Sequence, residues 1–412
     1  MKLGSMAWRN LWRRKRRTLI TAISIGFGVM LAVTFTGSGD YWYTNMINAG
    51  ATMGLGHITV EPHGYNQTPS LDKRLLNAGE VRKHVLTMPG VSNAIVRIMG
   101  QAMFASASKT IGGMFLAVDP SQESPDQNLL LRSLTQGQLF PGTDGRGIVV
   151  GSKMAKKLNL RIGKKLVYTT TDVSGEIVSE IARVTGIFKT GVSEMDGALV
   201  LLPINSVRAI LHYDDEDATL VAVTVNDQRY AESIRDKIAA AVGNPLREVL
   251  TWKQTQTELA GIITMDKSGN YITQVLIGLL IAAGILNTLL MSVLERTREF
   301  GVMMAVGMSP ATLFKLVLVE SFWLALIGLA VGIIITAPWY AYLHYVGLDF
   351  SGAIGKDYSA GGVLVDPIFR IRLYKESIIA ILAGVFSLTL LSGIYPAWRA
   401  GRTPPVESLK AI

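Results

Sequence analysis

The sequence predicts a membrane protein with four transmembrane α-helices and a large α+β extracytoplasmic (periplasmic) domain inserted between the first and second helices. Hydrophobic residues make up 49% of the 412 residues and charged residues only 17%, below the roughly 25% typical of soluble domains. The apolar residues are concentrated in four blocks rather than spread along the chain. This concentration favours transmembrane helices over a large soluble core.

The excess of basic residues lies beside the same apolar blocks. The formal net charge is +9, yet residues 38–271 contain 23 Lys or Arg and 23 Asp or Glu. The whole excess therefore lies in the segments that flank the apolar blocks. This distribution is typical of membrane proteins and argues against a nucleic-acid-binding face.

Each apolar block is long enough to cross a bilayer, which takes about 20 residues. The blocks at 18–37, 268–294 and 377–398 have no charged residue, and the block at 312–340 carries only Lys315 and Glu320. We therefore divide the chain into an N-terminal segment (1–17), TM1 (18–38), an α+β domain (39–266), a stalk end with TM2 (267–294), a cytoplasmic helix (295–311), TM3 (312–337), a periplasmic loop (338–376), TM4 (377–398) and a tail (399–412).

The orientation follows from the basic residues in short flanks. Six basic residues between Arg9 and Arg17 precede TM1 and predict a cytoplasmic N-terminus, and Arg399 and Arg402 after TM4 predict a cytoplasmic C-terminus. The loop between TM3 and TM4 also carries basic residues, such as Arg370, but we expect the N-terminal cluster to dominate. This predicts a multi-pass membrane protein with both termini in the cytoplasm.

The N-terminal segment reads as an amphipathic helix over residues 2–17. Leu3, Ala7 and Leu11 recur every four residues, with Trp8 and Trp12 beside them and arginines on the other face. Such a helix lies in the plane of the lipid headgroups. A short charged tail is the alternative.

The α+β domain alternates strand and helix patterns. The predicted strands are 57–61, 92–97, 102–107, 114–118, 147–150, 164–170, 176–188, 198–202, 219–225 and 248–250, and the predicted helices are 78–88, 152–158, 203 onward and 228–242. A further helix from about Thr251 is expected to run into TM2 as a stalk, with a loop at 266–270 as the alternative.

Catalytic motifs are missing from this sequence. It contains no cysteine, its five histidines show no metal-binding spacing, and neither GxxxxGK[ST] nor GxSxG occurs. An enzyme is therefore disfavoured, and the chain is expected to bind no nucleotide, metal or other cofactor itself.

The segment after TM2, ERTREFGVMMAVGM at 295–308, resembles the signature of the FtsX/MacB-type ABC transporter permease superfamily. The resemblance implies a cytoplasmic coupling helix that docks on an ATPase subunit. Phe300, Met303, Met304 and Gly307 fall on one helical face suited to an adaptable contact, and Glu295–Arg298 or Arg296–Glu299 can pair at i, i+3. The expected coupling residues are Glu295, Arg296, Arg298, Glu299, Phe300, Gly301, Met303, Met304 and Gly307.

Two polar residues lie within the predicted spans, Asn287 in TM2 and Glu320 in TM3. An acid at this depth usually faces a bundle interior or a polar partner, and a structural role near the interface is equally open. Gly328 and Gly332 form a GxxxG pattern that permits close helix packing. The stretches 395–400 and 405–409 resemble the usual C-terminus of the superfamily.

Within the superfamily, the chain is most similar to the LolC/LolE lipoprotein-releasing permeases, on GHITV at 56–60 and the GIFKTG…D run at 186–196. The resemblance implies a non-catalytic permease subunit that pairs with a second permease, identical or not. It also implies two ABC ATPase subunits that bind the ATP and Mg²⁺, and possible use of a periplasmic lipoprotein carrier. The resemblance also implies a location in the bacterial inner (cytoplasmic) membrane, and the implied work is extraction of lipoproteins from that membrane. A MacB-like exporter of peptides or small molecules and an FtsX-like regulator of a cell-wall hydrolase are the alternatives.

A lipid-anchored substrate requires an apolar cleft open to the outer leaflet. The expected lining residues are Val33, Phe35, Trp42, Met46, Ile262, Ile263, Met265, Tyr271 and Val275. They could equally be interfacial anchors, because aromatic residues gather at this depth. The hairpin at 171–176 is a candidate contact for a carrier.

Overall fold

The computed structural model describes residues 3–13, 15–125, 128–354, 359–360, 363–364 and 368–402. It divides into a membrane unit (Met1–Trp42, Met265–Phe350 and Ile368–Ile412) and an α+β domain (Tyr43–Thr264 with Ser351–Pro367), each described here by itself. The predicted C-terminal motif at 405–409 lies outside the described residues.

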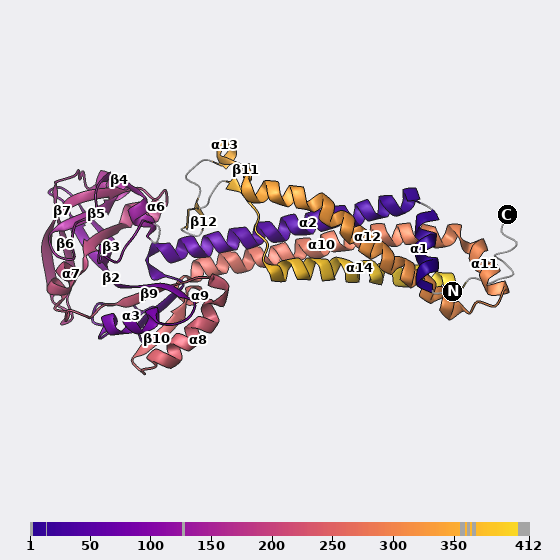
Figure 1. The fold of residues 1–412 in the computed structure, drawn as a ribbon. Coiled ribbons are helices and arrows are strands. Elements are labelled where there is room, and N and C mark those ends of the chain that lie inside the picture. Colours follow the sequence, from indigo (N-terminus) through magenta and orange to yellow (C-terminus); the bar gives the residue numbers. More distant parts are fainter. Residues whose placement is uncertain are drawn as a thin grey trace. The chain divides into compact units, whose positions relative to one another are not determined.

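The membrane unit consists of helices (Figure 1), and in the described part of the chain four helices are long and apolar enough to cross a membrane. Its elements are α1 (Leu3–Arg13), α2 (Lys15–Gly50), α10 (Thr257–Glu295), α11 (Thr297–Ala305), α12 (Pro310–Tyr345), the paired strands β11 (Leu348–Asp349) and β14 (Ile368–Phe369), and α14 (Lys375–Gly401). Four transmembrane helices, with the α+β domain between the first and second, confirm the predicted fold class.

The four long helices share one apolar core. Ile25 of α2, Ile285 of α10, Leu324 of α12 and Val385 of α14 are buried in the same cluster. Gly328 lies against Ile25, where a Cβ would approach within 3 Å. The GxxxG pattern of α12 thus marks close packing of α12 on α2, as predicted.

The α+β domain is built on strands in the order β10-β1-β9-β2-β3-β8-β5-β7-β4, with β6 joining β2 to β7. The strands are β1 (Ile58–Pro62), β2 (Val91–Ala105), β3 (Thr110–Val118), β4 (Leu134–Gly137), β5 (Gly147–Gly151), β6 (Lys165–Thr171), β7 (Ile177–Phe188), β8 (Leu199–Pro203), β9 (Leu220–Val225) and β10 (Arg247–Thr251). The helices are η1 (Ala51–Leu55), α3 (Ala78–Leu86), α4 (Leu129–Arg132), α5 (Ser152–Lys157), α6 (Ser193–Ala198), α7 (Ile204–Leu211), η2 (Gln228–Tyr230), α8 (Ala231–Val242) and α9 (Trp252–Thr255); α13 (Ser351–Ile354), β12 (Ser359–Ala360) and β13 (Val363–Leu364) belong to the same unit.

Strand β2 joins the two lobes visible in Figure 1. Its first half, from Val91 to Arg97, pairs with β9, and its second half pairs with β3 and β6. The second lobe closes into a ring, β2-β3-β8-β5-β7-β6, around buried residues such as Leu116, Val149, Phe188 and Leu201. Because the ring is closed, each of its six strands is hydrogen-bonded to a neighbouring strand on both sides.

Several predicted boundaries differ from the structure. The strands expected at 92–97 and 102–107 are one strand, because Gly100 has an extended backbone and pairs with Phe115. The helix expected from Thr251 is interrupted at Gln256, so α10 begins at Thr257. Residues 266–270 are helical, and the alternative of a loop there is wrong.

A carboxyl pair in β1 and β10 predicts how stability varies with pH. Glu61 is 2% exposed and lies opposite Glu248 in the antiparallel register. Burial raises the pKa of Glu61 to about 8, although the Asn66 N–H donates to its carboxyl. The folded domain therefore keeps this proton up to about pH 8, whereas the unfolded chain releases it near its ordinary value.

Stability should consequently fall as pH rises towards 8, by about 1.4 kcal/mol for each unit. Burial also lowers the pKa of His57 to about 4, so its titration makes stability rise with pH below about 6.5. The effect of Glu61 on stability is therefore best measured between pH 6.5 and 8. We expect Glu61→Gln to abolish the fall between pH 6.5 and 8, measured by hydrogen exchange of the β1 amides in the full chain. The exposed Glu194→Gln is the control. Equal slopes in wild type and Glu61→Gln would contradict the assignment.

Candidate functional site

The candidate site is the short helix α11 and the side chains that hold it between α10 and α12. Ser309 caps the start of α12, its Oγ accepting from the Thr312 N–H, and Pro310 occupies the first turn. Gly307 has φ of 101°, a conformation that favours glycine. These residues confine α11 to nine residues between two long helices.

The inner face of α11 is part of the core of the membrane unit. Phe300 is 0% exposed and packs in a cluster with Val293, Leu313 and Ala397. Met303 packs against the same cluster. Phe300 and Met303 were predicted to lie on a docking face. This prediction is wrong for Phe300, because α10, α12 and α14 already cover the apolar side of α11.

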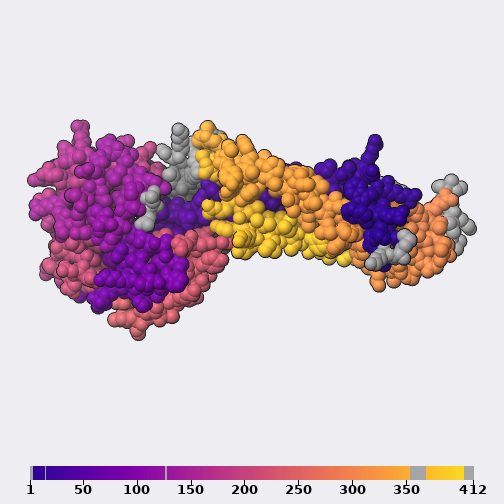
Figure 2. All heavy atoms as spheres, in the orientation of Figure 1, coloured from indigo at the N-terminus to yellow at the C-terminus, as the bar shows by residue number. Residues whose placement is uncertain are grey.

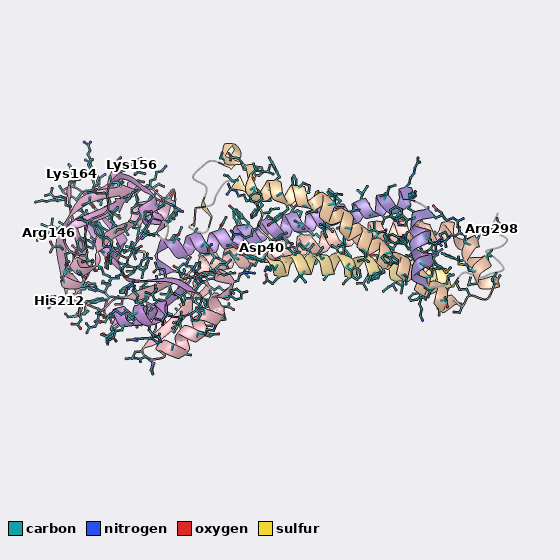
Figure 3. The ribbon with its side chains drawn as sticks, viewed as in Figure 1. Asp40, Arg146, Lys156, Lys164, His212 and Arg298 are labelled. Atoms are coloured by element: carbon teal, nitrogen blue, oxygen red, sulfur yellow. The ribbon has the colours of Figure 1, made fainter. Side chains whose placement is uncertain are left out.

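The outer face of α11 is formed by other residues. Arg298, Val302, Ala305 and Val306 are exposed, Val306 to 84%. Figure 3 shows Arg298 projecting from the end of the membrane unit. Their i, i+4, i+7, i+8 spacing places them on one side, and we call these four residues the outer face of α11. Sequence reasoning missed Val302 and Val306, although two valines four residues apart, opposite a phenylalanine, were a usable signal.

A buried ion pair fixes the start of α11. Arg296 Nη1 donates to both carboxylate oxygens of Glu320 at 2.9 Å, and its Nε donates to Glu299 Oε2 at 3.1 Å. The Arg296 and Glu320 side chains are only 8% and 10% exposed. The predicted i, i+3 pair of Arg296 and Glu299 is confirmed. Arg296 is also the polar partner of Glu320, whose burial in a membrane span without one would be strongly unfavourable.

Helix α1 completes the charge network. Asn10 Nδ2 donates to Glu320 Oε1 at 2.7 Å, and Arg13 lies 3.7 Å from Glu299. The indigo atoms of α1 lie against the orange atoms of α12 in Figure 2. Trp8 packs edge-on against Trp323 of α12, with ring centroids 5.0 Å apart. The N-terminal helix is thus tied to the bundle by polar as well as aromatic contacts.

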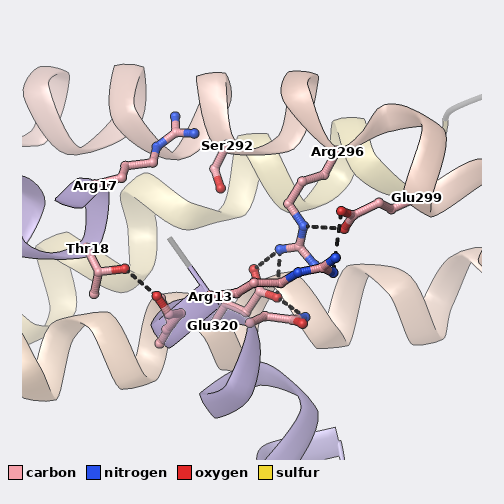
Figure 4. A pocket seen from close by; sticks show the side chains of 9 residues that line it. Arg13, Arg17, Thr18, Ser292, Arg296, Glu299 and Glu320 are labelled. Carbon is pink, nitrogen blue, oxygen red and sulfur yellow. Dashed lines mark hydrogen bonds and ion pairs between the residues drawn. The ribbon is translucent and has the colours of Figure 1, made fainter. Parts of the chain in front are cut away.

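Arg17, at the start of α2, reaches α10 in the same region. Its Nη1 donates to Glu295 Oε2 at 3.1 Å, and its Nη2 donates to the carbonyl of Thr288. Glu295 therefore pairs with α2, not with Arg298 as the sequence analysis allowed. A cavity of about 40 Å³, large enough for a few waters, lies inside the network (Figure 4). It is lined by Asn10, Leu11, Arg13, Arg17, Thr18, Ser292, Arg296, Glu299 and Glu320.

The charge network holds the ends of several helices together. It links α1, α2, α10, α11 and α12 through charge-assisted hydrogen bonds, and it contains no nucleophile beside a base. Among the described residues, no group of three or more His, Asp or Glu side chains could hold a metal ion. The network therefore connects the start of α11 with α2, α10 and α12.

The structure separates the residues predicted to line a substrate cleft. Val33 is buried in the core of the membrane unit, and Met46 and Ile263 are buried in the α+β domain. These three cannot line an open cleft, because helix packing covers them. Trp42 is half-buried, whereas the remaining five are exposed: Phe35, Ile262, Met265, Tyr271 and Val275.

Two further predicted sites lie apart from the network. Asn287 is exposed on α10, away from the Arg296–Glu320 pair. The hairpin at 171–176 is an ordered turn in which Asp172 accepts from the Ser174 and Glu176 N–H groups and contacts His212 at 3.1 Å. Its contact with a carrier remains a prediction.

Comparisons with known proteins agree with this architecture. Residues 18–241, more than half of the chain, match the MacB-like periplasmic core domain family, and residues 271–405 match the FtsX-like permease C-terminal family. The lipoprotein-releasing system transmembrane protein LolC of Xylella fastidiosa is 22% identical over 79% of both chains. An uncharacterized ABC transporter permease of Methanocaldococcus jannaschii is 24% identical over 98% of this chain and 97% of its own length.

The macrolide export ATP-binding/permease protein MacB of Shewanella oneidensis is 23% identical over 98% of this chain, which spans 60% of its length. Among solved structures, the periplasmic region of MacB from Actinobacillus actinomycetemcomitans covers 51% of this chain and 94% of its own, at 13% identity and a TM-score of 0.37. The chain belongs to the FtsX/MacB-type ABC transporter permease superfamily, with a MacB-like periplasmic core domain followed by an FtsX-like permease domain.

Proposed function

We propose that this chain is the permease subunit of a transporter that extracts lipoproteins from the outer leaflet of the inner membrane. A separate ATPase subunit would bind ATP and Mg²⁺, and two permease chains would work with two ATPase chains. In this proposal the termini and α11 lie in the cytoplasm and the α+β domain in the periplasm. The similarity to LolC over matched lengths supports the lipoprotein class.

The observation that carries the proposal is the exposed outer face of α11 on a rigidly held helix. Val302 and Val306 present apolar surface to solvent outside the spans, beside Arg298. Exposed apolar side chains rimmed by charge are typical of a protein contact. The Arg296–Glu320 pair anchors this surface, so movement of a bound ATPase would pull α10 and α12.

The transmitted movement would pass along α10, which is one helix from Thr257 to Glu295. A continuous helix is stiff along its axis, and this one extends from the α11 end of the membrane unit into the α+β domain. The exposed apolar residues Phe35, Met265, Tyr271 and Val275 are proposed to contact the acyl chains of the substrate.

Val306→Glu is expected to weaken the complex with the ATPase at least tenfold, because a charge would enter an apolar contact. The measurement is co-purification of the two co-expressed subunits, with ATP turnover recorded with and without a triacylated lipoprotein. Leu246→Glu, at an exposed leucine of the α+β domain, is the matched control. Wild type and Leu246→Glu should co-purify and respond to lipoprotein.

The outcomes separate the parts of the proposal. An ATPase complex that ignores lipoprotein would overturn extraction and favour an exporter or a regulator. A complex unaffected by Val306→Glu and by Val302→Glu would overturn the assignment of the outer face of α11. Absence of any ATPase complex would overturn the proposed function as a whole.

A further inference from the structure

The outward side of helix α1 carries both aromatic rings and positive charge. Helix α1 lies across the long helices of the membrane unit (Figure 1). On its inner side Ala7 is fully buried and Leu11 packs against the bundle core. Trp8, Arg9 and Trp12 are exposed. Because protein already covers the apolar stripe of α1, the side that faces away from the bundle combines indole rings with a guanidinium.

The N-terminal segment has a large excess of positive charge. Seven of the first 17 residues are Lys or Arg, and the first acidic residue of the chain is Asp40. The structure pairs Arg13 and Arg17 with glutamates of α11 and α10. Three others are exposed and form no ion pair with any residue that the structure describes: Arg9, Lys15 and Arg16. Their charge is therefore available to an anion outside the chain.

Apolar residues of α2 continue directly from these cations. Arg16, Ile20, Ile23 and Phe27 recur every three or four residues on one side of the helix, and the last three are each more than half exposed. The rise from Arg16 to Phe27 is about 16 Å, close to half of the ~30 Å hydrocarbon thickness. A cation followed by apolar surface over the depth of one leaflet matches a phospholipid, whose phosphate lies above its acyl chains. An acidic protein would match the cations alone.

The turn between α1 and α2 is fixed in the structure. Thr18 Oγ1 donates to the Leu11 carbonyl at 2.7 Å. The Trp8 ring packs edge-on against Trp12, with ring centroids 5.9 Å apart, and indole rings favour the headgroup level of a bilayer. We call the five exposed residues on either side of this turn the α1–α2 corner: Trp8, Arg9, Trp12, Lys15 and Arg16.

We propose that the α1–α2 corner binds the headgroup of an anionic phospholipid, and that the bound lipid keeps α11 anchored by holding α1 against the bundle. Anionic lipids attract basic residues beside a span, with a gain in affinity of about fivefold for each Lys or Arg. In the orientation given under the proposed function, this lipid belongs to the cytoplasmic leaflet. The site goes beyond that function and requires neither an ATPase nor a lipoprotein.

The link to α11 runs through the inner contacts of α1. Asn10 donates to the buried Glu320 carboxylate at 2.7 Å, and Arg13 lies 3.7 Å from Glu299 of α11. Both contacts are lost if α1 leaves the bundle. A lipid that binds only the docked α1 opposes that departure by mass action, and it thereby preserves the charge network at the start of α11.

Binding is measured on the full chain in a neutral detergent. Phosphatidylglycerol with brominated acyl chains is titrated in, and quenching of tryptophan fluorescence reports the bound lipid. Brominated phosphatidylcholine is the zwitterionic comparison. Phosphatidylglycerol should bind saturably with a dissociation constant at least about tenfold lower than that of phosphatidylcholine, and added salt should raise that constant.

Charge variants locate the site. The triple variant Arg9→Gln, Lys15→Gln and Arg16→Gln should raise the dissociation constant for phosphatidylglycerol about 100-fold. Removal of three exposed lysines of the α+β domain changes the net charge equally and should leave binding unchanged: Lys156→Gln, Lys157→Gln and Lys164→Gln. Arg9→Lys with Arg16→Lys keeps the charge and should bind within about threefold of wild type, which separates loss of charge from loss of folding.

Hydrogen exchange tests the link to α11. Saturating phosphatidylglycerol should slow exchange of the amides of residues 297–305 at least about threefold in wild type, and it should have no such effect in the triple variant. Asn10→Ala should bind the lipid with wild-type affinity and lose most of this response, because the contact of α1 with Glu320 is absent.

Equal dissociation constants for the two lipids, or for wild type and the triple variant, would overturn the site. Displacement of phosphatidylglycerol by inorganic phosphate at the same concentration would show a site for free anions instead. Unchanged exchange of α11 in lipid-saturated wild type would refute the link. The assays contain neither an ATPase nor a lipoprotein, so their failure leaves the proposed function standing, and absence of an ATPase complex leaves this site standing.

Discussion

Replacing Arg296 with methionine is expected to lower the free energy of unfolding of the membrane unit by about 3–5 kcal/mol. Arg296 and Glu320 form a bidentate pair at 2.9 Å, and both side chains are at least nine-tenths buried. Removal of the guanidinium leaves the Glu320 carboxylate buried, with the Asn10 amide as its remaining donor among the residues that the structure describes. The cost is the desolvation of that carboxylate, which the ion pair now offsets.

The measurement is a denaturation curve of the purified full chain in mixed detergent micelles. Arg298→Met, which removes an exposed arginine two residues away, should change stability by less than about 1 kcal/mol. The double variant Arg296→Met with Glu320→Leu should regain most of the loss, because it removes both buried charges. A double variant as unstable as Arg296→Met alone would contradict an ion-pair origin of the effect.

The second large effect is expected in the α+β domain, where Arg97 and Glu123 form a similar pair. Arg97 Nε and Nη2 donate to the Glu123 carboxylate at 2.9 and 2.8 Å, and the side chains are 2% and 0% exposed. Arg97 Nη1 also donates to the carbonyl of Gly54 at 2.6 Å. Gly54 belongs to η1, the segment that follows α2, so this arginine attaches η1 to β2.

Arg97→Met should therefore destabilise the domain by about 3–5 kcal/mol and detach η1. Limited proteolysis should then show faster cleavage within 51–56, and hydrogen exchange should show less protection of β2. The exposed pair of Lys253 and Glu232, with side chains 54% and 61% exposed, is the control; Lys253→Met should cost less than about 1 kcal/mol. Unchanged cleavage within 51–56 would refute the role assigned to Arg97.

The two buried pairs have a common functional meaning. Arg296 holds α11 against the spans, and Arg97 holds the end of the α2 segment within the α+β domain. Both are positions where force would enter or leave a long helix. Under the proposed function, weaker contacts at either position would reduce how much of an ATPase movement reaches the long helices. A milder variant that still folds, such as Asn10→Ala, should then show a smaller rise of ATP turnover on addition of lipoprotein.

Sequence reasoning predicted the features that depend on local composition. The four spans followed from the length of their apolar runs, because a bilayer imposes that length on any helix that crosses it. The order of strands and helices in the α+β domain was largely predictable from alternation and turn residues. The predicted helix at 78–88 corresponds to α3, and the predicted strand at 164–170 to β6.

The exposed side of α11 could not be predicted from the sequence. Periodicity showed that Phe300 and Met303 share a side, but it could not tell whether that side meets a partner or the chain's own bundle. The answer depends on Val293, Leu313 and Ala397, which lie on three other helices. The same holds for Glu320, whose partner Arg296 is 24 residues away in the chain.

Local patterns were enough to predict the four spans, the position of the α+β domain between the first two, and the superfamily. Hydrophobic length, periodicity and a contiguous motif are all properties of neighbouring residues. The folded chain was needed to show which side of α11 is free, which carboxylate pairs with Arg296, how β2 closes a ring with β6, and that Asn287 faces outward. Each of these depends on contacts between segments far apart in the chain, where packing and charge pairing of the folded state choose among alternatives that local patterns leave equal.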